Sequence, residues 1–457
     1  MKFLNVEIPV RNLPVLDETF VPLGLFFEQY RKLAQKPLCI AVERSGGQIG
    51  IYETNVCGTP DMAAADAYYV DRLVKFLLWS WGGFKVTVCG SDALGAQIKA
   101  AYTAEGSRAF DKSFMEQVYE RPFEVDVVPY DKKPSPHTKA EAVGRHLTGC
   151  RIGFDAGGSD RKVSAVIDGV PVYSEEVVWF PKTNADPEYH YQGIVEAFKT
   201  AASKMPRVDA IGVSSAGVYI DNRCMVASLF LKVSREDFVN KVQNIYLRAA
   251  KEIGDVPVVV ANDGDVTALA GAMGLGENGV LGIAMGTSEA VGYVDTDGNI
   301  TGWLNELAFA PVDGQSGAMA DEWSGDIGCG VKYFSQDAVI KLAPAAGITL
   351  KGESPAEKLK EVQALMEQND PRAAQIYESI GVYLAHTLAL YAQFYDIRHV
   401  LMLGRVTSGK GGDILMDTAA RVLKEEYPAI AFVPETPDEK TRRVGQSVAA
   451  ASLPEIR

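Results

Sequence analysis

The sequence predicts an α/β protein of two or three domains, and three observations support this class. The chain has 457 residues, more than one hydrophobic core usually organises. From residue 150 onward, short apolar runs of strand length alternate with longer segments of helical periodicity. Turns of small residues follow several of the apolar runs, as they do at the strand ends of α/β sheets that bind ligands.

Composition argues against several classes of partner. The chain is 47% hydrophobic and 23% charged, as is typical of a globular protein. Its formal net charge is -14 and it has no run rich in Lys or Arg, which argues against nucleic acid or an anionic membrane as partner. Phosphate ligands stay compatible with this charge, because backbone N–H groups and Mg²⁺ can bind them locally.

The cysteines and the apolar runs predict where the protein works. Six cysteines are scattered without a CxxC pair, which indicates neither a disulfide framework nor a zinc or iron–sulfur ligand set. No signal peptide is evident at the start, and the apolar stretches are too short to cross a bilayer. We therefore expect a cytoplasmic protein.

The first 145 residues are expected to form an N-terminal α/β region. The pattern predicts helices over 25–34, 63–79 and 93–102, and strands over 38–43, 48–52, 85–89 and 123–128. The strand, glycine turn and strand over 40–52 echo the stretch that begins at Ile152, so a degenerate internal repeat is one interpretation. Glu43 stands where the echo would need an aspartate, which favours the later region for the chemistry.

The stretch over 151–175 organises the second region. An apolar strand over 152–154 delivers Asp155 to its carboxyl end, and Gly157-Gly158-Ser159 then turns the chain. The two glycines have no Cβ, so their N–H groups can approach an anion closely. A phosphate would repel Asp155, but Asp155 can hold a magnesium ion that neutralises the phosphate. Taken alone, the same residues also describe an ordinary hairpin with a Gly–Gly turn.

The elements that follow keep the α/β alternation. Helices are expected over 189–204, 238–253, 266–273, 356–368, 372–394, 412–425 and 441–453, and strands over 208–213, 256–261, 280–285, 290–294, 399–403 and 430–433. The segment over 302–332 is irregular and rich in Gly, Asp, Trp and Phe. Irregular stretches of this length inside a compact domain are usually functional.

Several strand ends carry ligand-binding turns. Gly157-Gly158-Ser159, Gly286-Thr287-Ser288 and the glycines from Gly404 to Gly412 are three of these turns, and Asn262-Asp263 follows a fourth strand. Ligands of α/β sheets bind at the carboxyl ends of strands, so these are the places to expect a nucleotide. Neither a Walker A pattern nor a GxGxxG motif is present, which argues against a P-loop and a dinucleotide site.

These motifs, in this order and spacing, resemble the ROK family of sugar kinases, within the actin/hexokinase/Hsp70 superfold. The resemblance covers residues 150–457 and implies a ribonuclease H-like kinase of two lobes with a cleft between them. The matching stretches are Asp155-Ala-Gly-Gly-Ser159 and Gly286-Thr287-Ser288 for the two phosphate motifs, Val213 to Asp221 for the sugar loop, Asn262 to Ala270 for the stretch with the catalytic base, Met402-Leu-Gly404 for the adenosine motif, and Gly445 to Ala450 for the closing helix.

The resemblance implies transfer of the γ-phosphoryl group of ATP to a sugar hydroxyl. In that reaction Asp263 would be the general base and Asp155 would hold Mg²⁺. The two groups of binding residues that it implies are Gly157, Gly158, Ser159, Gly286, Thr287, Ser288 and Gly404 for ATP, and Ser215, Gly217, Asn262 and Glu306 for the sugar or sugar derivative. A homodimer is an option, because dimers are common among similar kinases.

The sequence also departs from the family pattern. The family's zinc signature, a CxCGxxGC run with an upstream His, is missing; Phe309 replaces the His, and Cys329 is the lone cysteine nearby. Arg405 and Val406 replace glycines that are usual at the adenosine motif. The first 145 residues are not part of a minimal kinase and lack a clear helix-turn-helix. These departures leave open a second reading, a non-catalytic sensor of a sugar or nucleotide.

Each proposed role has a structural alternative. Asp263 could simply cap a helix, Asp155 could be a solvated hairpin carboxylate, and Glu306 could be an exposed loop residue. A third class, an ATPase activator of a radical enzyme, is disfavoured. Its bridging iron–sulfur cluster needs cysteines on a shared face, and none are paired here.

Overall fold

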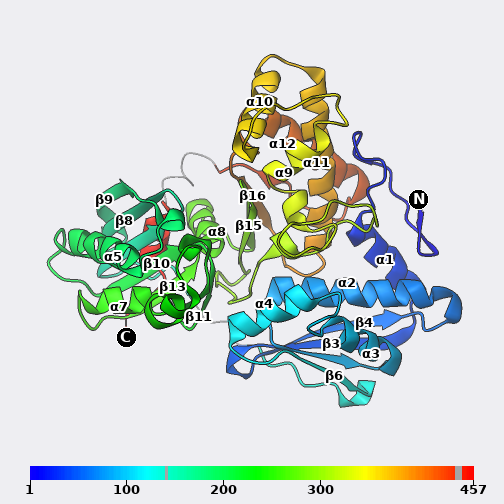
Figure 1. Ribbon diagram of the computed structural model, residues 1–457, viewed down its shortest axis with the longest axis horizontal. Helices are drawn as coiled ribbons and strands as arrows, with labels where there is room; N and C mark the ends of the chain where they lie inside the picture. Colours follow the sequence, from blue (N-terminus) through cyan, green and yellow to red (C-terminus); the bar gives the residue numbers. More distant parts are fainter. Residues whose placement is uncertain (139–142, 438–444, 457) are drawn as a thin grey trace. The chain divides into compact units, whose positions relative to one another are not determined.

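The computed structural model describes residues 1–138, 143–437 and 445–456 (Figure 1). The chain divides into two compact units. Unit 1 comprises Met1–Lys139, Ile283–Val291 and Trp303–Thr436, and unit 2 comprises Ala140–Gly282, Gly292–Gly302 and Pro437–Arg457. The N-terminal region therefore groups with most of the later half of the chain.

A five-stranded sheet forms the centre of unit 2. Its order is β13 (Val258–Asn262), β10 (Ala210–Ser215), β7 (Cys150–Ala156), β8 (Asp160–Ile167) and β9 (Val170–Val178). The strands β13, β10 and β7 are parallel, and β8 and β9 add to them as an antiparallel hairpin. Every residue of β7 and β10 is buried, as the predicted apolar runs require of strands covered on both faces.

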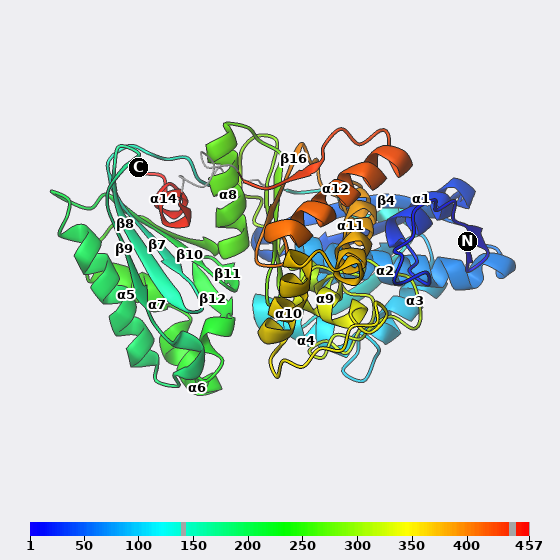
Figure 2. The same cartoon turned by 90° about the horizontal axis from the view of Figure 1, so that it is seen from above.

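Helices cover both faces of this sheet. Figure 2 shows α5 (Pro187–Ala202) and α7 (Ile245–Lys251) on one face, and α8 (Asp263–Leu275) and α14 (Gln446–Ala451) on the other. Two strand glycines let α14 approach the sheet closely. A Cβ on Gly153 would overlap the carbonyl oxygen of Ser447, and a Cβ on Gly212 would overlap that of Ala450. The first four residues of the predicted helix over 441–453 lie outside the described residues.

The helix expected over 238–253 is interrupted, so this prediction is wrong in part. A short helix α6 (Arg235–Asp237) leads into a π-helical turn over Phe238–Val242, and α7 begins only at Ile245. The break coincides with a contact from outside the helix. The carbonyl oxygen of Gln243 accepts the N–H of Cys224 at 2.8 Å, which anchors the end of the π turn to a neighbouring strand.

That neighbouring strand belongs to a hairpin that the sequence analysis did not predict. The hairpin pairs β11 (Val218–Ile220) with β12 (Arg223–Val226) in antiparallel register. Asp221 and Asn222 form the turn with φ values of 50° and 63°, a left-handed conformation that these two residue types tolerate. The side chain of Asn222 then accepts the N–H of Val260, which ties the turn to β13.

Unit 1 begins with a short strand pair, β1 (Lys2–Phe3) and β2 (Val6–Glu7), and a second mixed sheet. This sheet has the order β4 (Ile49–Val56), β3 (Lys36–Glu43), β5 (Lys85–Cys89) and β6 (Glu124–Val128). Its helices are α1 (Leu23–Leu33), α2 (Ala63–Trp81), α3 (Asp92–Ala101) and α4 (Ala109–Tyr119), the last of which was not predicted.

The topology of this sheet differs from that of unit 2. The strands β3 and β5 pair antiparallel, whereas their counterparts β7 and β10 pair parallel. The suggested repeat therefore extends to the opening hairpin only, and the third strand enters each sheet in the opposite direction.

The remainder of unit 1 combines long helices with most of a third sheet, two of whose strands continue into unit 2. The sheet order is β15 (Glu289–Val294), β14 (Val280–Met285), β16 (His399–Leu403) and β17 (Pro434–Glu435). The helices are α9 (Gln336–Leu342), α10 (Pro355–Glu367), α11 (Pro371–Tyr391) and α12 (Gly409–Glu426). The strand predicted over 430–433 is wrong: β17 begins at Pro434, where its register with Val400 of β16 starts.

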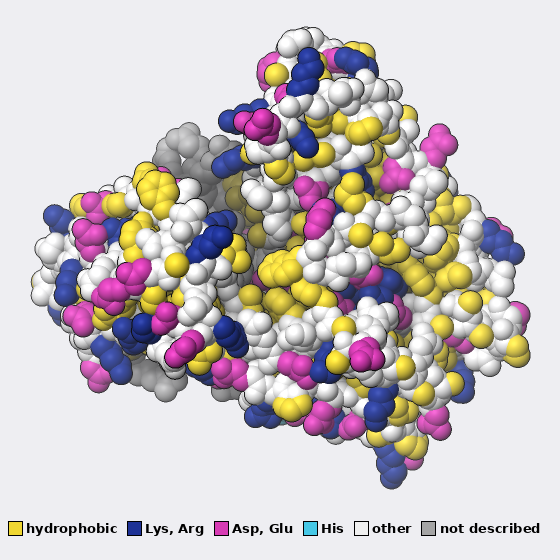
Figure 3. Space-filling model, viewed as in Figure 1, with side chains coloured by type: hydrophobic (Ala, Val, Ile, Leu, Met, Phe, Trp, Pro, Cys, Tyr) yellow, Lys and Arg dark blue, Asp and Glu magenta, His cyan; other side chains and the backbone are white. Residues whose placement is uncertain are grey.

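Two surface properties bear on possible partners. Figure 3 shows acidic and basic side chains interspersed over the face in view. Within the part of the chain that the structure describes, no helix is long and apolar enough to span a bilayer.

Candidate active site

Two carboxylates meet at one edge of the sheet of unit 2. Asp155 in β7 lies opposite Ser214 of β10, which lies opposite Ala261 of β13. Asp263 follows Ala261 by two residues and begins α8. Parallel strands end at the same edge of the sheet, and hydrogen bonds through Ser214 and Gln446 connect the Asp155 carboxylate to the backbone carbonyl of Asp263, so both residues lie at this edge. The structure thus brings together the two acidic residues singled out in the sequence.

The pKa of Asp155 rises to about 6, chiefly because burial penalises the charged carboxylate. The Oγ of Ser214 opposes this by donating a hydrogen bond to Oδ1 at 2.9 Å. Gln446 of α14 donates in turn to Ser214 Oγ at 2.9 Å and to the carbonyl oxygen of Asp263 at 3.0 Å. One glutamine therefore connects the surroundings of both carboxylates.

Asp263 is a more basic carboxylate than an ordinary aspartate. Burial raises its pKa, while the N–H of Gly264 and the charge of Lys182 act in the opposite direction. Gly264 donates to Asp263 Oδ1 at 3.0 Å and also to Asn262 Oδ1 at 2.7 Å. The capping of α8 is therefore carried by Asn262, and Asp263 sits in the first turn.

The glycine turn after β7 lies against a cation. A Cβ on Gly158 would be 2.8 Å from Cε and 3.0 Å from Nζ of Lys182, so only glycine leaves the lysine in place. A Cβ on Gly157 would be 2.7 Å from the carbonyl oxygen of Asp160. Ser159 is exposed, and its carbonyl oxygen accepts the N–H of Trp179 at 3.1 Å. The turn is thus compact, with an exposed lysine at its surface.

The side-chain amide of Asn262 makes two hydrogen bonds within unit 2. Its Oδ1 accepts the N–H of Gly264, and its Nδ2 donates to the carbonyl oxygen of Gly217 at 2.7 Å. One N–H and one lone pair are left for a ligand. Gly217 has φ 133°, and a Cβ there would approach Ala227 to 2.7 Å, so it shapes the loop that receives Asn262.

Ser215, which was predicted to bind the sugar, is enclosed within unit 2. Its side chain is fully buried, and its Oγ lies 2.7 Å from the hydroxyl oxygens of both Tyr219 and Tyr246. Two tyrosines thus engage this hydroxyl in the structure, and its contact with a sugar stays a prediction. Ser215 is buried because β10 continues through Ser214 and Ser215, which carries Ser215 into the core.

The other predicted nucleotide-binding residues lie in unit 1. Gly286, Thr287 and Ser288 turn the chain between β14 and β15; the N–H of Gly286 donates to the carbonyl oxygen of Ser288 at 3.0 Å, and Thr287 and Ser288 are exposed. Gly404 ends the neighbouring strand β16 with φ 97°, and a Cβ there would collide with the backbone of Met285. Unit 1 therefore holds these two glycine turns side by side.

Glu289, directly after this turn, is a buried acid that the sequence analysis missed. It is 4% exposed, and burial together with the charge of Glu306 raises its pKa to about 8. The hydroxyl of Tyr391 donates to its Oε1 at 3.2 Å. Within the described residues, Oε2 has no hydrogen-bond partner. Glu289 is therefore protonated at neutral pH, beside the glutamate predicted to bind the sugar.

The N-terminal region holds Glu306 in place. The N–H groups of 304–306 donate to the carbonyl oxygens of Trp81, Ser80 and Trp79 at the end of α2, at 3.0–3.3 Å. The last turn of a helix leaves its carbonyl groups without partners inside the helix, and here the loop over 304–306 supplies the missing N–H donors. Glu306 is half-buried where this segment enters a short 3₁₀ turn.

Phe309, which stands where the family has its zinc histidine, lies in an aromatic cluster. Its ring centroid is 4.5 Å from that of Trp79, and the rings of Phe110, Phe114 and Trp323 lie within 6.2 Å. Three of these neighbours come from α2 and α4. An apolar cluster thus occupies the place of the metal ligand.

A buried ionic cluster holds the other end of the same loop. Asp326 pairs with Arg72 at 3.0 Å, Lys75 at 3.2 Å and Arg108 at 2.6 Å, and these cations hold the pKa of its carboxyl far below the usual range. Lys75 also pairs with Asp111 at 2.9 Å. Among the described residues, no group of three or more His, Cys, Asp or Glu side chains could hold a metal ion.

Four residues of these sites escaped the sequence analysis: Ser214, Gln446, Lys182 and Glu289. Gln446 lies in the stretch Gly445 to Ala450, which was matched to the family's closing helix, and Ser214 lies in the stretch Val213 to Asp221, which was matched to the sugar loop. For Lys182 and Glu289 the sequence carries no comparable signal, since their positions depend on which segments pack against them.

The sheet of three parallel strands with a hairpin, the acidic residues at its edge and the glycine turns of unit 1 define a protein with the actin/hexokinase-like fold. Residues 151–424 match the model of the ROK family, which is more than half of the chain. The protein therefore belongs to the ROK family. No curated protein matches it by sequence.

Three of the solved structures that are similar to this chain are members of the same family. A ROK hexokinase from Thermus thermophilus is 20% identical with a TM-score of 0.51, over 66% of this chain and 97% of that one. A ROK family transcriptional regulator, a homolog of the E. coli MLC protein, is 16% identical with a TM-score of 0.50, over 67% and 79%. A ROK glucokinase from Streptomyces griseus with glucose and AMPPNP is 20% identical with a TM-score of 0.47, over 66% and 98%.

Proposed function

We propose that this protein transfers the γ-phosphoryl group of ATP to a hydroxyl of a sugar or sugar derivative. The observation that carries the proposal is the approach of Asp155 and Asp263 at the sheet edge of unit 2, beside the glycine turn and Lys182. Membership of a family whose structures include hexokinases and glucokinases supports a sugar as acceptor.

In this reaction Asp263 takes the proton of the attacking hydroxyl. Its raised pKa makes it a better base than an ordinary aspartate, and general-base help is worth about 10²–10⁴-fold. Asn262 offers its remaining N–H and lone pair to the sugar, and Glu306 offers acceptor oxygens. Asp263 thus removes the proton, while Asn262 and Glu306 orient the sugar.

The residues near Asp155 fit a magnesium nucleotide. Magnesium is usually held by one or two carboxylates together with substrate phosphates, so the small number of acidic groups here is sufficient. Asp155 would hold the ion, which when bound neutralises phosphate charge. Gly157, Gly158 and Ser159, with Gly286, Thr287, Ser288 and Gly404, would offer backbone N–H and hydroxyl groups to ATP, and Lys182 would add a positive charge beside the turn.

The test is phosphorylation with Mg-ATP across a panel of sugars, comparing the protein with its Asp263→Asn variant. We expect at least one sugar to be phosphorylated, and the variant to lose about 10²-fold or more of kcat while it still binds the sugar. Asp255→Asn, the same change at an exposed position of unit 2, is the matched control and should keep its activity. Equal activity of Asp263→Asn would refute the role of the base.

One observation favours a second function, a sugar or nucleotide sensor without turnover. Arg405 and Val406 follow Gly404 where the family resemblance leads us to expect glycines, and the family also includes a transcriptional regulator. Val406 is fully buried, with its N–H donated to the carbonyl oxygen of Met285. Sugar binding by calorimetry without phosphorylation of any sugar would support the sensor.

A further inference from the structure

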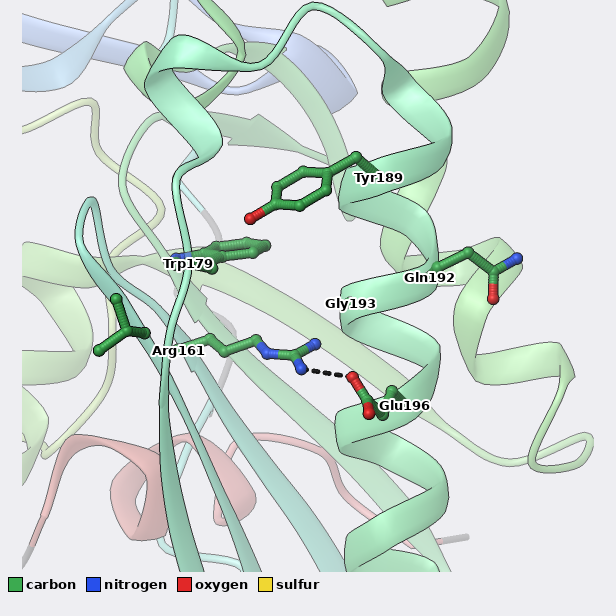
Figure 4. Close-up of a pocket in the computed structure, with 7 residues that line it drawn as sticks. Arg161, Trp179, Tyr189, Gln192, Gly193 and Glu196 are labelled. Carbon is green, nitrogen blue, oxygen red and sulfur yellow. Dashed lines mark hydrogen bonds and ion pairs between the residues drawn. The ribbon is translucent and has the colours of Figure 1, made fainter.

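An ion pair of unit 2, with a buried cation and an exposed carboxylate, lines two cavities. Arg161 of β8 is 7% exposed, and its Nη2 donates to Oε2 of Glu196 on α5 at 2.6 Å (Figure 4). A cavity of about 340 Å³ and another of about 130 Å³ are both lined by these two residues. The Glu196 side chain is 71% exposed, so the cation of this pair is buried while its partner faces solvent.

The guanidinium of Arg161 is incompletely satisfied. Within the described residues, Nε and Nη1 have no hydrogen-bond partner, although a guanidinium carries five N–H donors. Gly193 makes room for it: a Cβ there would be 2.8 Å from Nη1. An anion that displaces Glu196 would therefore meet a planar cation whose donors are largely unused.

The larger cavity adds groups that would hold the body of such an anion. Figure 4 shows the rings of Trp179 and Tyr189 together on one side of the guanidinium, with Gln192 further along α5. The aromatic rings offer apolar contact to the body of such an anion. The volume is that of a pocket for a small molecule.

We propose that this pocket binds a small organic anion whose carboxylate or phosphate group replaces Glu196 on Arg161 and whose ring or apolar body contacts Trp179 and Tyr189. The site is separate from the residues assigned to phosphoryl transfer.

The pocket adjoins the glycine turn through one side chain. Nε1 of Trp179 donates to the carbonyl oxygen of Gly157 at 2.8 Å, and the Trp179 N–H donates to that of Ser159. A ligand that shifts Trp179 therefore acts on the turn. Any effect on turnover rests on the proposed function, whereas binding does not, so the experiment measures binding in the absence of ATP and sugar.

The experiment uses the full chain with phenyl phosphate, benzoate and inorganic phosphate as probes. Binding is followed by calorimetry and by tryptophan fluorescence, to which Trp179 is the only contributor in unit 2. We expect phenyl phosphate or benzoate to bind, and inorganic phosphate to bind about tenfold more weakly because it lacks a ring. The stronger of the two aromatic probes identifies phosphate or carboxylate as the preferred group.

Variants locate the binding. Arg161→Met should weaken the aromatic probe at least about tenfold, and Glu196→Gln should strengthen it about tenfold by removing the competing carboxylate. Lys199→Met, the loss of an exposed cation on the same helix, should change nothing. Should Arg161→Met fail to fold, the gain in Glu196→Gln still decides. The proposal is overturned if Glu196→Gln binds the aromatic probe with the same affinity as the parent protein. It is also overturned if neither aromatic probe binds to Glu196→Gln at about 10 mM.

Discussion

The protonated state of Glu289 leads to a specific prediction about stability and pH. The pKa of this buried side chain is raised from 4.5 to about 8, first by burial and then by the charge of Glu306. Between these two values the unfolded chain is ionised at this position and the folded chain is protonated. The folded state therefore binds the extra proton, and its free energy of unfolding falls as the pH rises through this window.

The size of the effect follows from the difference between the two pKa values. Each pKa unit corresponds to about 1.36 kcal/mol, so the full window corresponds to at most about 5 kcal/mol. Glu289→Gln keeps the shape of the protonated acid and cannot ionise. We expect the variant to lie within about 1 kcal/mol of the parent protein at pH 4.5, and to be more stable than it by several kcal/mol at pH 8.

Urea unfolding at pH 4.5, 6.5 and 8 measures this difference, with tryptophan fluorescence as the signal because four of the five tryptophans lie in unit 1. Glu378→Gln, the same change at an exposed position of α11, is the matched control and should show no trend with pH. A difference between Glu289→Gln and the parent that is constant across the three pH values would refute the buried, protonated glutamate.

Two further predictions concern the packing of each unit. Asp326→Asn leaves three buried cations without their shared carboxylate and should lower the free energy of unfolding by about 3–5 kcal/mol. The control Asp413→Asn, on the exposed side of α12, should leave this free energy unchanged. Equal urea unfolding curves for the two variants would contradict the ionic cluster. Gly212→Ala places a methyl group against a backbone carbonyl of α14 and should cost at least about 3 kcal/mol, because a backbone cannot yield as a side chain can. Gly254→Ala, where a Cβ has room, is the control and should change the free energy of unfolding by less than about 1 kcal/mol in a thermal unfolding experiment. If Gly212→Ala has the same free energy of unfolding as this control, α14 does not lie against Gly212.

Local patterns in the sequence were sufficient for most of the elements. The apolar run before Asp155, the helix before Gly82 and the strand over 399–403 agree with the observed elements to within a few residues. These elements are signalled by period and by terminating glycines, which act within a few residues. The interrupted helix near Gln243 was missed because the contact that coincides with the break comes from a distant strand.

The sequence by itself determined the chemistry available at the strand ends: Asp155, the glycines after it, and Asn262 with Asp263. Such motifs are readable because a strand, a turn and a helix start are local, and parallel strands bring their ends to one edge. The tertiary structure alone decided that Ser215 is buried, that Glu289 is protonated, and that Arg161 is sequestered beside a cavity. Burial and electrostatics depend on every segment packed around a side chain, and those segments are distant in the sequence.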